Sequence, residues 1–182
     1  MPQLILPNHI DEHAFRAAFP LPYQTRALSP WEAYGLGLNH KVQWWYFEEP
    51  FEYHSAKFGP ICIPKGAITD AASVPLRLQS LIGRTDPTII FASAPHDWLF
   101  DTCGMTEQPL GPQTLLLLDD QGLLEPGQTT RRLTFDQCNE VLIEAMGICG
   151  ASKAMRHLVF LAVKNGGKKL WNAKNPPRKY RA

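Results

Sequence analysis

The chain has 182 residues, 45% of them hydrophobic and 10% aromatic, which is enough for one packed core and too few for two. It has no run of about 18 to 20 apolar residues that could span a membrane, and it starts without the basic and apolar segments of a signal peptide. Its four widely spaced cysteines argue against a zinc site or a disulfide framework. We therefore expect one intracellular domain, residues 1–182, with reduced thiols.

The net charge of +1 hides a strong asymmetry along the chain. Glu144 is the last acidic residue, and nine lysines and arginines follow it, whereas the first 144 residues hold nine bases and seventeen acids. A basic end of this kind can bind nucleic acid, a membrane surface or an acidic protein partner, or it can be a solvated tail. For the basic tail, residues 172–182, these alternatives stay open, although few aromatic residues accompany its bases.

Five prolines punctuate residues 1–40, and this pattern predicts an irregular N-terminal arm outside the core, with one short helix near residues 11–18. Residues 42–63 are rich in aromatic and β-branched side chains, which are typical of strands. They predict two or three antiparallel strands in one small sheet.

The middle of the chain contains two predicted helix starts and a predicted insertion. Ser73 with a following proline predicts a helix to about residue 82, and Asp86 followed by Pro87 predicts another. Pro95 should kink that second helix or make it restart, because proline has no N–H to donate. Residues 102–130 are rich in Gly, Pro and Gln and predict a hairpin insertion.

Two amphipathic helices end the chain. The first covers about residues 134–147, and the second begins after Ser152 and should end at Gly166. Apolar residues recur at helical spacing on one face of each, namely Cys138, Val141, Leu142 and Ala145, then Met155, Leu158, Val159 and Ala162. We expect an α+β fold, a small antiparallel sheet packed by three to four helices, with its core in residues 41–171.

The order of the segments "IPKGAITDAASVP", "APHDWLF", "FDQCNEVLIEAMGICG" and "GGKKLW" resembles a phage and prophage family catalogued as domain of unknown function 1353. The resemblance covers about residues 51–171. It implies a phage-encoded protein, of a kind often found among structural and tail genes, with no agreed reaction. This chain has Ala67 where the family usually has an aromatic residue, Phe100 where it has tyrosine, and Asn139 where an aromatic is frequent.

The segment "PHDWLFD" places His96 beside Asp97 in a helix, so the two side chains point about 100° apart. His96 could act as a general base on water while Asp97 holds a cation, with Asp70 and Asp136 as supporting acids. This arrangement resembles secreted phospholipase A2, where a His-Asp pair faces an aspartate on a second helix. Asp136 would be that aspartate.

A structural role explains the same residues. His96 can bond a carbonyl freed by Pro95, Asp97 can stabilise a helix start, and Asp70 can bond the turn after it. Asp136 lies nearly opposite the apolar face of its helix, and Glu140 and Glu144 continue that solvated stripe. In both interpretations we expect His96, Asp97, Asp70 and Asp136 to form one polar cluster.

The leading hypothesis is a bacteriophage structural protein of the tail or neck, made in the host cytoplasm and located in the virion, that binds other virion proteins and needs no cofactor. The alternative is a metal-dependent hydrolase, similar to phospholipases or cell-wall hydrolases, in which Asp97 binds a divalent cation such as calcium. The sequence leaves catalysis open and favours the structural role.

Overall fold

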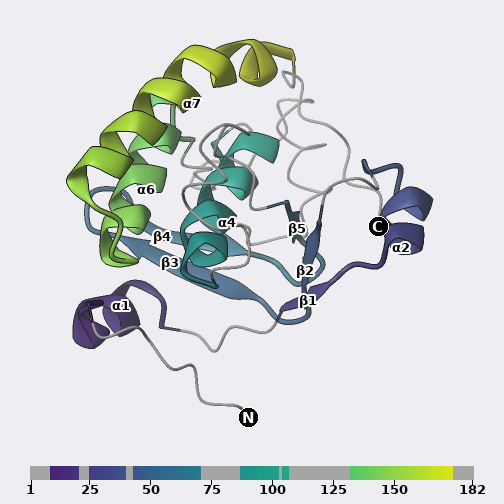
Figure 1. Ribbon diagram of the computed structural model, residues 1–182, viewed down its shortest axis with the longest axis horizontal. Coiled ribbons are helices and arrows are strands. Elements are labelled where there is room, and N and C mark those ends of the chain that lie inside the picture. The colour runs from purple at the N-terminus through teal and green to yellow at the C-terminus, as the bar shows by residue number, and fades with distance from the viewer. Residues whose placement is uncertain are drawn as a thin grey trace, which may run out of the picture.

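The computed structural model describes residues 9–20, 25–39, 43–70, 87–102, 104–106 and 132–173. It combines helices with two small antiparallel sheets, which confirms the predicted α+β class (Figure 1). The helix expected from Ser73, most of the expected insertion and the tail beyond Ala173 lie outside the described residues. Within the described ranges, no helix combines the length and the apolar character needed to cross a membrane.

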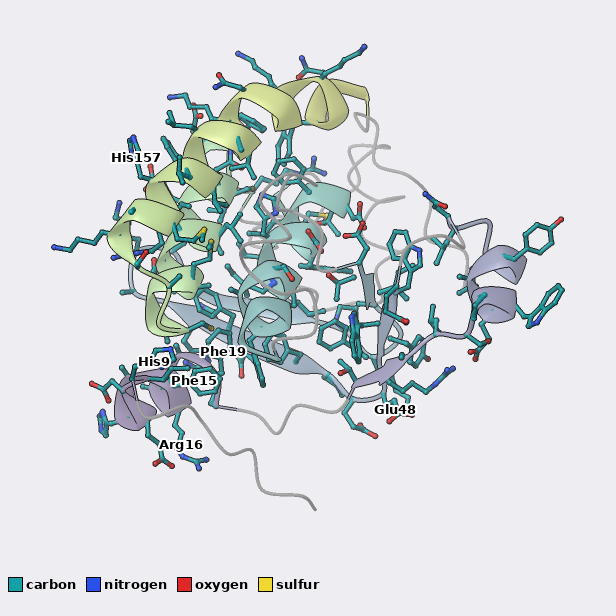
Figure 2. The ribbon with its side chains drawn as sticks, in the orientation of Figure 1. His9, Phe15, Arg16, Phe19, Glu48 and His157 are labelled. Atoms are coloured by element: carbon teal, nitrogen blue, oxygen red, sulfur yellow. The ribbon has the colours of Figure 1, made fainter. Side chains whose placement is uncertain are left out.

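Helix α1, Glu12–Ala18, forms where the sequence predicts it, and the Asp11 side chain caps it by accepting a hydrogen bond from the Ala14 N–H. Phe15 and Phe19 of this segment are buried in the main core, where Phe15 lies 5.1 Å from the ring of Phe91. Figure 2 shows both phenylalanines pointing toward the body of the molecule and Arg16 pointing away. The prediction that the N-terminal arm lies outside the core is therefore wrong.

The strands form two sheets rather than one. Strands β1 (Thr25–Ala27), β2 (Trp45–Phe47) and β5 (Ile68–Thr69) make one sheet with β2 in the middle, and β3 (Phe51–Ser55) and β4 (Gly59–Ile63) make a hairpin. The single sheet expected over residues 42–63 is corrected, because β2 pairs with a strand of the arm on one side and with β5 on the other. Pro50, which has no N–H for a ladder bond, separates β2 from β3.

Helix α2, Pro30–Gly35, was not predicted, although the sequence contains the residues of a helix start. Ser29 accepts a hydrogen bond from the Glu32 N–H, and the Glu32 carboxylate accepts one from the Ser29 N–H. Pro30 occupies the first helical position, where a missing N–H costs nothing. This capping box fixes a short helix that projects from the β1 edge of the molecule (Figure 1).

Helices α4 (Pro87–Asp101) and α6 (Phe135–Ile148) pack on the strands, and a third helix, α7 (Lys153–Ala173), packs on α6. Helix α4 lies in the middle and contacts β4, β5 and α6, while α6 lies between α4 and the outermost helix α7 (Figure 1). Helix α4 continues as one helix through Pro95, so of the two predicted outcomes, a kink or a restart, the restart does not occur. In α6, the four residues predicted for the core face are all buried, which confirms that face.

Helix α7 continues past the Gly166 at which it was predicted to end. A Cβ atom at Gly167 would lie 3.3 Å from ring atoms of Phe100 and Phe135, so glycine lets the helix approach these rings closely. One turn later, Trp171 packs edge-on against both rings. This tertiary packing outweighs the low helix propensity of glycine, and the helix continues to Ala173.

The insertion expected at residues 102–130 was predicted to begin too early in the chain. Thr102, Met105 and Thr106 are buried, and the Thr106 carbonyl accepts a hydrogen bond from the Cys62 N–H at 3.0 Å. Met105 pairs with Arg132 in an isolated antiparallel bridge. The residues up to Thr106 therefore belong to the core, because their backbone extends the hydrogen bonding of β4.

Candidate functional site

His96 lies in the interface between α4 and α6, with 3% of its surface exposed. Its Nδ1 is 3.6 Å from Oδ1 of Asp97, and its Nε2 is 3.2 Å from Oδ1 of Asn139 on α6. The centre of the imidazole ring also lies 4.3 Å from that of the Phe100 ring, with the two planes tilted by 38°. The ring is thus surrounded by protein groups from two helices.

Asp97 connects α4 to the sheet. Its Oδ2 accepts a hydrogen bond from the hydroxyl of Thr69, a buried residue at the end of β5, while its other oxygen faces His96. Neighbours along a helix point in different directions, so one carboxylate can reach the sheet while the next-door imidazole reaches α6. Thr69, His96, Asp97 and Asn139 form what we call the His96 cluster.

The predicted supporting acids have different positions. Asp70 directly follows Thr69 and is partly exposed, so β5 places it beside the His96 cluster. Asp136 is exposed in the first turn of α6, and Asn139, one turn later, occupies the position that faces His96. The expectation that Asp136 joins the cluster does not hold, because the acid keeps the solvated side of the helix while the neutral amide is buried.

Asn139 was not predicted as a site residue, although the sequence contained a signal, since an aromatic residue is frequent there in the family pattern. Its side chain is fully buried, and its Nδ2 has no hydrogen-bond partner. With Oδ1 toward the ring, Nε2 must carry a proton, so the contact fits the Nε2–H tautomer or the imidazolium ion.

This arrangement limits the chemistry of His96. A general base must present an unprotonated nitrogen within hydrogen-bond reach of the proton it removes. Nε2 instead faces Asn139 inside the core, and Nδ1 faces Asp97. Across the part of the chain that the structure describes, no three histidine, cysteine, aspartate or glutamate side chains converge as metal ligands would.

A second polar site lies at the other end of α6. The Glu144 carboxylate accepts hydrogen bonds from the Tyr53 hydroxyl at 3.0 Å, the Ser55 hydroxyl at 2.9 Å and the Ala56 N–H at 2.7 Å. Burial, and then the charge of Glu144, raise the pKa of Tyr53 above its ordinary value. Glu144 was expected on a solvated stripe, but the β3–β4 hairpin covers it, so that expectation is wrong.

Beside Glu144 lies a groove of about 230 Å³ between α6, α7 and the hairpin, lined by Lys57, Glu140, Ile143, Glu144, Arg156 and Phe160. Lys57 and Glu140 form an exposed ion pair across it at 2.8 Å, and this hydrogen bond and charge raise the pKa of Lys57. The Nε atom of Arg156 is buried without a hydrogen-bond partner. Two of the charged side chains that line the groove, Lys57 and Glu140, therefore pair with each other.

One protein family, described as "Protein of unknown function (DUF1353)", has a model that matches residues 45–163 of the chain. The match includes the whole His96 cluster and Glu144, and it excludes α1, β1 and α2. No curated protein and no solved structure matches the chain significantly.

Proposed function

Because the chain belongs to the DUF1353 family of proteins of unknown function, we propose its role from its surfaces: it is a bacteriophage structural protein of the tail or neck that binds neighbouring virion proteins. The phage origin rests on the resemblance of its spaced motifs to a phage and prophage family. The binding role rests on α2, which lies outside the matched residues.

Two large aromatic side chains on α2 carry this proposal. Trp31 and Tyr34 have 84% and 68% of their surface exposed, and Leu36 beside them is also exposed. Tryptophan and tyrosine are enriched at the centres of protein interfaces, where burying them contributes most of the binding energy. An exposed apolar group of this size on a soluble surface is typical of a binding site.

The helix that carries these side chains is held in place before any partner binds. Its capping box fixes the first turn, and Arg26 of β1 forms an ion pair with Glu32 at 2.8 Å. Arg26 also lies over the ring of Tyr46 in β2, 5.1 Å from its centre. A pre-ordered helix loses little conformational entropy on binding, which favours a docking role.

The hydrolase alternative draws less support from the geometry. It requires a nitrogen of His96 that can take a proton from water, and Asn139 faces the Nε2 that would do so. It also requires Asp97 to hold a cation, while the two oxygens of Asp97 face Thr69 and His96. A core polar connection between α4, α6 and β5 accounts for all of these contacts.

The proposal is tested in a phage or prophage that encodes the chain. Purified particles should contain the protein by mass spectrometry, and Trp31→Ala should lower its incorporation without changing its thermal transition. Arg16→Ala is the matched control, because Arg16 is exposed on α1 and points away from the body (Figure 2). Absence of the protein from particles, or hydrolysis of esters or peptides lost in His96→Ala, would contradict the virion role.

A further inference from the structure

The outward side of α7 is basic with an apolar centre. Leu158 and Leu161 have 47% and 43% of their surface exposed, while Val159 and Val163 on the opposite side are buried. The α7 face consists of these two leucines, the exposed lysines of the same helix, Lys153, Lys164 and Lys168, and the exposed His157. Helix α7 contains no acidic residue.

The α2 end of the molecule has a complementary composition. The α2 face consists of Trp31, Tyr34 and Leu36, of Glu32 on the same helix, and of Glu48 and Glu49, which directly follow β2. Arg26 is shared between Glu32 and Glu48, at 2.8 and 3.8 Å, and Lys65 lies 3.7 Å from Glu49. Three carboxylates therefore face two cations in the described part of this region, which leaves it negative.

The two faces lie on opposite sides of the molecule. In Figure 2, His157 projects from α7 on one side, while Glu48 lies on the other side near β1. One copy therefore cannot bring its own two faces together. When two different surfaces of the same chain are complementary, the contact between copies is head-to-tail and leads to a ring or a filament.

We propose that the α7 face of one copy binds the α2 face of a second copy, with Leu158 and Leu161 against Trp31 and Tyr34 and with lysines opposite glutamates at the rim. This inference deepens the proposed function by naming one neighbour, a second copy of this chain. An apolar centre with a charged rim is the usual composition of a protein interface. Charge complementarity of the two rims would fix the direction of assembly.

A nucleic acid fits the α7 face less well. Binding to the phosphate backbone needs cations, and single strands add aromatic side chains on which bases stack. The centre of the α7 face is aliphatic, so a bound nucleic acid would place its charged phosphates against Leu158 and Leu161, which is unfavourable. Among the residues that the structure describes, the large exposed aromatic side chains are Trp31 and Tyr34 on α2, which is where a protein partner with exposed leucines would bind.

The test uses the purified full-length protein alone, followed by sedimentation velocity over a range of concentrations and salt. The average mass should rise with concentration and fall at high salt, since the rim charges are screened. Leu161→Glu and Trp31→Glu, both at exposed positions, should each weaken self-association at least tenfold and keep the parent thermal transition. Arg16→Ala should associate like the parent.

Mixing the two variants identifies the faces. Leu161→Glu keeps an intact α2 face and Trp31→Glu keeps an intact α7 face, so the mixture should form one-to-one dimers although each variant alone stays monomeric. Failure of the mixture to associate would overturn the inference, and so would a monomeric parent protein. Binding of a short DNA duplex by a monomeric parent, lost on Lys164→Glu, would assign the α7 face to nucleic acid instead. A monomer that still enters particles would leave the proposed function intact.

Discussion

Asn139 and Glu144 are both polar residues on the packed side of α6, but their hydrogen bonds are satisfied to different extents. Glu144 accepts three hydrogen bonds from the β3–β4 hairpin. Asn139 contacts His96 through one atom and leaves its buried Nδ2 without a partner. A buried polar group stabilises a fold only when its partners are complete, so the two sites should respond differently to substitution.

The largest effect is expected for Glu144→Ala. The substitution removes the acceptor of Tyr53, Ser55 and Ala56 together, and hydrogen bonds to a charged group are the stronger kind. The free energy of unfolding should fall by about 3 kcal/mol in urea denaturation. A loss no greater than that of Glu140→Ala would show that the hairpin bonds are dispensable.

His96→Ala should have the next largest effect, a loss on the order of 1 to 3 kcal/mol, because it removes the hydrogen-bond partner of the buried Asn139 Oδ1. The double replacement His96→Phe with Asn139→Leu should cost less than His96→Ala, since both partners become apolar. Chelator should change none of these melting temperatures. A calcium-dependent or zinc-dependent shift abolished by Asp97→Asn would instead assign the cluster to a cation.

Tyr53 gives a test of the Glu144 site by pH. Its pKa is raised from 10.0, so the folded chain keeps the hydroxyl proton that the unfolded chain releases. The stability that Tyr53 contributes to the fold is fully present below the pKa of the unfolded chain, and it is lost as the pH rises from there through the raised pKa of the folded chain. Tyr53→Phe should lower the free energy of unfolding by about 1 kcal/mol at neutral pH. The variant should also be destabilised less by alkaline pH than the parent, because phenylalanine does not ionise. Tyrosinate absorbance should show one of the five tyrosines ionising only on unfolding.

The smallest effect is expected for Glu140→Ala, because among the described residues its carboxylate has one ion pair, the exposed one with Lys57. Both side chains are largely exposed, so solvent screens the pair. The thermal transition should move slightly at low salt and not at all at high salt. A large shift that persisted in salt would mean that the groove depends on this pair.

Local sequence signals predicted the elements whose stability is local. The helical spacing of apolar residues was sufficient to predict α6, and a short helix was predicted near residues 11–18, where α1 forms. The α+β class followed from the same signals. The adjacency of His96 and Asp97 in a helix was also predicted correctly.

Contacts between distant segments were not predictable in this way. The burial of Phe15 depends on Phe91, far along the chain, and the continuation of α7 depends on rings that pack on Gly167. A helical wheel places Glu144 in solvent, but it contains no information about the hairpin that covers that side. The motif favoured an acid opposite His96, and the tertiary fold placed an amide there.

The bridge between Met105 and Arg132 has a consequence for how the chain tolerates changes of length. The Leu133 N–H also donates to the Gly104 carbonyl at 2.8 Å, so backbone pairing joins the residues around Met105 to those around Arg132. With both ends fixed by hydrogen bonds, doubling the intervening length costs only about 0.6 kcal/mol of closure entropy. We therefore expect a change in the number of residues between Thr106 and Arg132 to leave the packing of α4 on α6 intact, as measured by urea denaturation.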